Sequence, residues 1–120
     1  MNEYIGTLFQ SRTQSHIYHL QTSSYSKHIA LNAYYDGIIG LVDGIAEAYQ
    51  GKYDIIKGYK MNGTIKDLEN DEDVITYFEQ LAIYCELKRT KLPQDSYLVN
   101  LYDGVDELIR STLYKLKRLA

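Results

Sequence analysis

Four potential metal ligands, His16, His28, Asp43 and Glu47, are the side chains whose types and spacing could do chemistry. Two imidazoles with two carboxylates suit Fe(II), and zinc or manganese could also bind such a set. If residues 24–50 form one helix, its rise places both carboxylates roughly 20 Å or more from His28. One chain therefore cannot close the site. Two antiparallel copies of this helix around a two-fold axis would place His28 of one subunit beside both carboxylates of the other.

The predicted helix has two further features that favour such a dimer. Asp43 and Glu47 lie on adjacent turns, so both carboxylates can bind one cation. Glycine inside a helix costs about 0.5 to 1 kcal/mol relative to alanine, so a run of helical glycines needs a compensating contact. A two-fold axis near Gly37 would supply that contact and the ligand geometry together. The small residues that would allow the close approach are Ala30, Ala33, Gly37, Gly40, Gly44 and Ala48.

His16 lies about as far before the turn at residues 21–24 as His28 lies after it, so a helical hairpin would bring both imidazoles to one end. His19, one helical turn beyond His16, is either an auxiliary ligand or a surface residue. Each histidine alone is more typical of a surface or a satisfied core position, and each carboxylate of a solvated helix face. The four ligands together with the small-residue strip favour a metal site.

Apolar side chains at helical spacing predict four helices that would position these residues. The first spans residues 3–21 and the second residues 25–50, with Ser24 as N-cap and Gly51 as C-cap. A crossover over residues 51–70 includes Ile55 and Ile56, which could form one helical turn. A third helix begins near residues 70–71, and a fourth follows Pro93. The inward positions are expected to include Tyr4, Ile5, Leu8, Leu20, Leu31, Tyr34, Ile38, Val42, Ile45, Val74, Phe78, Leu81, Cys85, Leu98, Tyr102, Val105, Ile109, Leu113 and Leu116.

Helices joined by short, long and short connections predict an all-α, ferritin-like four-helix bundle with one long crossover between the second and third helices. The 120 residues, 45% of them hydrophobic, predict one domain spanning residues 1–120. A net charge of −3 with scattered basic residues makes DNA binding unexpected. The lone Cys85 excludes an intrachain disulfide and is expected to be a buried small side chain. With no apolar leader and no long apolar run, we expect a cytoplasmic protein that does not enter a membrane.

The pattern His-x11-His-x14-Asp-x3-Glu from His16 to Glu47 resembles the signature of Dps, the miniferritins of bacterial stress defence. The resemblance implies a ferroxidase site shared by two subunits of a dodecameric shell, where hydrogen peroxide or O2 oxidises Fe(II) for iron storage or peroxide protection. His16 and His28 would come from one subunit, and the catalytic carboxylates Asp43 and Glu47 from its mate, with Glu47 as the bridging ligand. Small Dps-like proteins also occur in bacteriophage genomes, which would place this one in host cytoplasm or virion.

Three departures from the Dps pattern keep other readings open. Ile17 stands where the family commonly has tryptophan, and Asn32 stands where it often has an acidic residue that supports a ligand. The chain is also short and lacks a lysine-rich N-terminal tail, so family-typical DNA binding is not expected. The main alternative is a non-catalytic ferritin-like structural or protein-interaction module, in a viral context, whose metal site is vestigial. A third reading is a small helical regulator with coincidental ligands.

Overall fold

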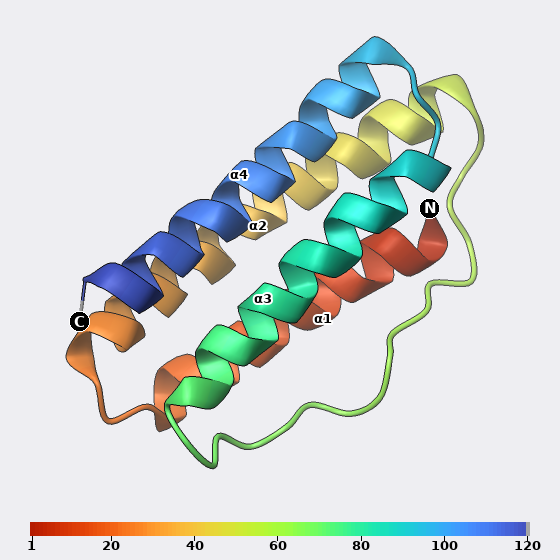
Figure 1. The fold of residues 1–120 in the computed structure, drawn as a ribbon. Helices are drawn as coiled ribbons and strands as arrows, with labels where there is room; N and C mark the ends of the chain where they lie inside the picture. The colour runs from red at the N-terminus through yellow and green to blue at the C-terminus, as the bar shows by residue number, and fades with distance from the viewer. Residues whose placement is uncertain (120) are drawn as a thin grey trace.

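The computed structural model describes residues 1–119, which contain four α-helices, one short 3-10 helix and no strand. Figure 1 shows α1 and α4 running one way along the molecule and α2 and α3 the other. The short links make α1/α2 and α3/α4 antiparallel hairpins, as predicted. The elements are α1 (Asn2–Gln21), α2 (Tyr25–Lys52), α3 (Glu72–Lys88), η1 (Arg89–Lys91) and α4 (Ser96–Arg118). No helix in this part of the chain is both long and apolar enough to cross a membrane.

The start of α2 is confirmed by its cap, but its end is not where the sequence suggested. The Ser24 hydroxyl accepts a hydrogen bond from the backbone N–H of Lys27 at 3.3 Å. Gly51 was predicted to be the C-cap, yet it has no positive φ and the helix continues to Lys52, with Tyr53 as the C-cap. Lys52 and Tyr53 both donate hydrogen bonds to the Asp95 carboxylate. These contacts with the start of α4 hold the extra residues in place.

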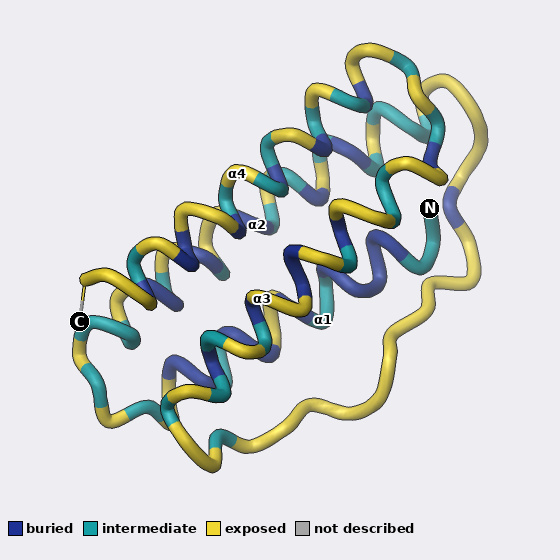
Figure 2. The backbone as a smooth tube through the Cα atoms, viewed as in Figure 1, coloured by how far each residue is buried: buried dark blue, intermediate teal, exposed yellow. Residues whose placement is uncertain are grey.

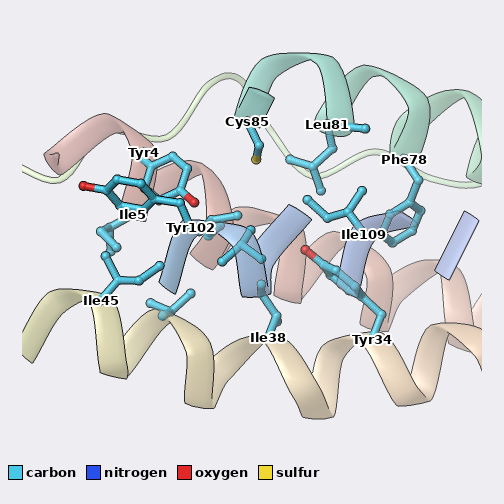
Figure 3. Packing of buried hydrophobic residues seen from close by; sticks show 14 of the residues in the cluster. Tyr4, Ile5, Tyr34, Ile38, Ile45, Phe78, Leu81, Cys85, Tyr102 and Ile109 are labelled. Carbon is cyan, nitrogen blue, oxygen red and sulfur yellow. The ribbon is translucent and has the colours of Figure 1, made fainter. Parts of the chain in front are cut away.

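One hydrophobic core fills the space between the helices, and Figure 2 shows the buried residues facing inward. Figure 3 shows Tyr4 packed edge-on against Tyr102, and Tyr34 against Phe78, with ring centres 5.7 and 4.7 Å apart. Fully burying an aliphatic or aromatic side chain contributes about 1.5–3 kcal/mol. The buried apolar side chains confirm most of the predicted inner positions: Tyr4, Ile5, Leu8, Leu31, Tyr34, Ile38, Val42, Ile45, Val74, Phe78, Leu81, Cys85, Leu98, Tyr102, Val105, Ile109, Leu113 and Leu116.

The second half of α1 departs from the predicted apolar stripe. Leu20, expected inside, is 67% exposed. The inner face of α1 is here largely polar, with Ser11, Gln14, Ser15 and His19 buried. Ser11 and Tyr34 share a buried hydrogen bond of 2.7 Å between their hydroxyl groups. This polar face explains why the α1 pattern looked interrupted in the sequence.

The long connection between α2 and α3, residues 53–71, lies along the outside of α1 and α3 (Figure 1). Glutamines of α1 fix it: the Gln14 amide both donates to the backbone oxygen and accepts from the backbone N–H of Lys66, and Gln10 does the same at Asn62. Gly6 is required below it, because a Cβ there would lie 1.9 Å from the Lys60 carbonyl oxygen. The helical turn suggested for Ile55 and Ile56 does not form.

Candidate metal centre

Three histidines from two helices meet near the α1/α2 turn. His16 and His19 lie on α1, and His28 lies on the first turns of α2. The rings of His19 and His28 stack with their centres 3.7 Å apart, and the His16 and His19 ring centres are 5.8 Å apart. The hairpin therefore gathers imidazoles at one end, as the sequence predicted, with His19 as the direct neighbour of His28.

His19 and His28 are held by a reciprocal pair of hydrogen bonds. The Nδ1 atom of His19 lies 2.7 Å from the carbonyl oxygen of His28, and Nδ1 of His28 lies 2.8 Å from the carbonyl oxygen of His19. A carbonyl oxygen only accepts, so both rings carry a proton on Nδ1. In the neutral imidazoles the lone pair is then on Nε2, the arrangement that metal-binding histidines commonly have.

His16 is placed by packing. Its ring stacks on Tyr35 with the centres 4.1 Å apart. The Tyr35 hydroxyl donates to the Asn32 side-chain oxygen at 3.0 Å, and the Asn32 amide donates to Asp36 at 2.7 Å. Asn32, the residue at the position where a supporting acidic group was expected, thus supports Tyr35 instead.

The two predicted carboxylate ligands lie apart from the histidines. Asp43 and Glu47 are exposed on α2, and none of the hydrogen bonds or ion pairs within residues 1–119 involves either side chain. No group of three or more His, Cys, Asp or Glu side chains in this range is placed to hold a metal ion. The predicted site, which needs a second subunit, remains a prediction.

The small-residue strip of α2 has a partner that the sequence argument did not consider. A Cβ at Gly37 would lie 3.4 Å from the Leu108 side chain, and one at Gly44 would lie 4.0 Å from Leu101, so both positions face α4 of the same chain. Gly40 meets nothing within 4 Å. These are ordinary van der Waals distances, so Gly37 and Gly44 lie beside α4 of the same chain although a Cβ would fit at both positions.

Two signals in the sequence could have identified the role of His19. It lies three residues after His16, on the same helix face, and it is nearly as far from the 22–24 turn as His28 is. Cys85, by contrast, is buried as predicted, and burial raises the pKa of its thiol to about 12. A thiol held neutral in this way is a poor nucleophile and a poor metal ligand.

A family model described as a family of unknown function (DUF5856) matches residues 19–116. The matched range includes His19, His28 and both carboxylates, and it begins after His16. No curated protein and no solved structure matches the chain.

Proposed function

The chain belongs to the DUF5856 family, and we propose that this member is a ferritin-like, Dps-type protein that takes up Fe(II) as its substrate. It oxidises Fe(II) with hydrogen peroxide or O2 at a site shared across a two-fold dimer. The His16 and His28 end of one subunit faces Asp43 and Glu47 of the other. A dodecameric shell for iron storage or peroxide protection would be built from such dimers.

The connectivity supports a ferritin-like fold. Two antiparallel hairpins are joined by one long connection, residues 53–71, so that α2 and α3 run in the same direction. A single long crossover between two hairpins is the arrangement of ferritin-like bundles. The glutamine contacts from α1 give this connection a defined path without a helix of its own.

The observation that carries the proposal is the division of ligands along α2. Imidazoles gather at its first turns, while two carboxylates that have no partner within residues 1–119 lie exposed about 20 Å further along the same helix. Two copies of α2 packed antiparallel would bring each imidazole end to a carboxylate pair, producing two equal sites. Imidazole and carboxylate ligands fit Fe(II) and leave coordination positions for the oxidant.

Each group has a definite task in such a site. The imidazoles hold the ion through neutral nitrogen atoms, and backbone carbonyl groups fix the orientation of two of the rings. The Asp43 and Glu47 carboxylates offset the charge that grows as Fe(II) becomes Fe(III), and the resemblance to Dps gives Glu47 the role of bridging ligand. The electrons that reduce the oxidant come from the iron.

Subunit exchange tests the shared site. His16→Ala and Glu47→Ala homodimers should each lose fast Fe(II) oxidation, because each lacks one ligand in both sites. In a mixed dimer one site lacks both ligands and the other is intact, so activity should return to at most about half the wild-type value per dimer. A flat oxidation trace after exchange has been verified by mass spectrometry would reject the intersubunit site.

The second candidate is a ferritin-like structural or protein-interaction module without catalysis. Two observations favour it: the packing of Gly37 and Gly44 against α4, and the reciprocal His19–His28 hydrogen bonds, which stabilise the hairpin whether or not a metal binds. A purified oligomer that neither binds nor oxidises Fe(II) selects this function. A monomer in light scattering argues against both candidates.

A further inference from the structure

The spacing of His16 and His19 suits a single metal ion within one chain. Residues three apart on a helix share one face. Their ring centres are 5.8 Å apart and the ring planes are inclined by 69°. Two imidazoles on one tetrahedral ion, with metal–nitrogen distances of about 2.0–2.1 Å, have their ring centres roughly 5 to 6 Å apart. The observed separation therefore fits two ligands of one ion.

The His19–His28 pair does not fit one ion. These rings are nearly parallel, at 17°, with their centres 3.7 Å apart. The lone pair of an imidazole nitrogen lies in the plane of its ring, and the planes of this pair run side by side. An ion about 2.0–2.1 Å from both nitrogens would have to lie well outside both planes. His28 is therefore unsuited to share an ion with His19 in this arrangement.

His28 does have a clear positioning role. Its backbone carbonyl oxygen accepts the Nδ1 proton of His19 at 2.7 Å, which leaves Nε2 of His19 as the donor atom for a metal. Its ring covers one face of the His19 ring and donates to the His19 carbonyl oxygen. The acceptor that orients His19 belongs to the backbone, so any residue at position 28 would provide it.

The donor atoms are within reach of an ion from solvent. Across residues 1–119, only Tyr4 Oη and Thr7 Oγ1 are side-chain nitrogen or oxygen atoms that are buried without a hydrogen-bond partner. Nε2 of His19 has no hydrogen-bond partner in this range and is not one of these fully buried atoms, although the residue as a whole is only 7% exposed. The Tyr35 ring flanks both histidines, at 4.1 Å from His16 and 5.3 Å from His19, and its hydroxyl is bonded to Asn32.

We infer that His16 and His19 bind one divalent transition-metal ion within a single chain, and that His28 positions His19 without coordinating the ion. Imidazole pairs suit Zn(II), Ni(II) and Cu(II), with Cu(II) bound most tightly. This site goes beyond the shared iron site, because it needs neither a second subunit nor the α2 carboxylates.

The test is a zinc titration by calorimetry in an Asp43→Ala/Glu47→Ala background, which removes the carboxylates of the shared site. One ion per chain should bind. Adding His19→Asn should weaken binding at least about tenfold, whereas adding His28→Ala should change it by no more than about threefold. Asparagine retains a donor toward the His28 carbonyl oxygen, so the hairpin contact is kept while Nε2 is lost. Tyr35→Phe is the matched control and should bind as the background does.

Cu(II) electron paramagnetic resonance supplies a second readout. The hyperfine pattern should show two imidazole nitrogens in the background protein and in His28→Ala, and one nitrogen in His19→Asn and in His16→Ala. The His16 side chain makes no hydrogen bond within residues 1–119, so His16→Ala keeps the His19–His28 contacts. His16→Ala therefore remains a usable test if His19→Asn fails to fold.

Loss of binding in His28→Ala with retention in His19→Asn would overturn the inference, as would the absence of zinc binding in the carboxylate-free background. Neither zinc-binding result determines the outcome of the subunit-exchange test. Conversely, failed activity recovery with zinc still bound by single chains would reject only the shared iron site.

Discussion

The two ends of the helical assembly differ in whether their ionisable side chains pair with one another. At the end that holds η1, Arg89 pairs with Asp106 at 2.6 Å and with Asp103 at 2.5 Å, and its guanidinium lies 5.8 Å from the Tyr102 ring centre. The Arg89 and Asp106 side chains are only 20% and 17% exposed. Opposite charges here satisfy one another within the chain.

At the end that holds the α1/α2 turn, three histidines meet with no carboxylate among their hydrogen-bond partners in residues 1–119. Backbone carbonyl groups and stacked rings hold them instead. Partnered charges at one end stabilise the fold, whereas ring nitrogens without protein partners at the other remain available to a ligand.

The largest expected effect is at the partnered end. Arg89→Ala would leave the half-buried Asp106 carboxylate without its partner, and we expect the free energy of unfolding to fall by about 2 to 3 kcal/mol. Burial already raises the pKa of Asp106 despite the attraction of Arg89. Urea denaturation followed by circular dichroism measures the change.

Arg110→Ala is the matched control for this substitution. Arg110 pairs with Glu86 at 2.6 Å, but both side chains are about half exposed. An exposed pair contributes at most about 0.5 to 1 kcal/mol, so this variant should change stability little. Equal losses in the two variants would show that burial is not what makes the Arg89 pairs important.

How far the sequence predicted this contrast depends on the distance over which each signal acts. The periodicity of apolar residues located all four helices, and the Ser24 cap located the start of α2. The long connection has no such period: its path depends on Gly58 and Gly63, which have positive φ, and on the close approach at Gly6. Those contacts join residues more than fifty positions apart.

The histidine cluster was predicted only in part for a related reason. The ligand spacing identified His16 and His28, but the stacking of His19 on His28 depends on how α1 and α2 rotate about their axes. The glycine strip was expected to pack on a second copy of α2, but Gly37 and Gly44 lie beside α4 of the same chain. The carboxylate half of the site needs a second chain, which no pattern within one chain places in space.

A smaller effect is expected from the reciprocal histidine pair. In a double-mutant cycle with His19→Ala and His28→Ala, we expect a coupling of about 0.5 kcal/mol from the stacking of the two rings, because the backbone oxygens that accept their Nδ1 protons remain in every variant. Chemical denaturation of the four proteins in the presence of a chelator measures it. Additive losses would show that the two rings do not stabilise the hairpin together.

The smallest effect concerns Asp95, which ties the end of α2 to the start of α4. Hydrogen bonds from Lys52 and then Tyr53 lower the pKa of Asp95 below its usual 3.8. A carboxyl group with a lowered folded-state pKa contributes stability that is present above 3.8 and is lost as the pH falls through the lowered value.

The stability difference between wild type and Asp95→Asn should therefore shrink as the pH is taken from well above 3.8 to well below it. Because the Lys52 contact is the largest cause, the same comparison in a Lys52→Gln background should depend less on pH. Asp106, whose pKa burial raises, has the opposite sign, so its ionisation costs stability as the pH rises. Urea midpoints of wild type, Asp95→Asn, Lys52→Gln and the double variant are measured at the two pH values. A stability difference between wild type and Asp95→Asn that stays constant or grows on acidification would contradict the lowered pKa of Asp95.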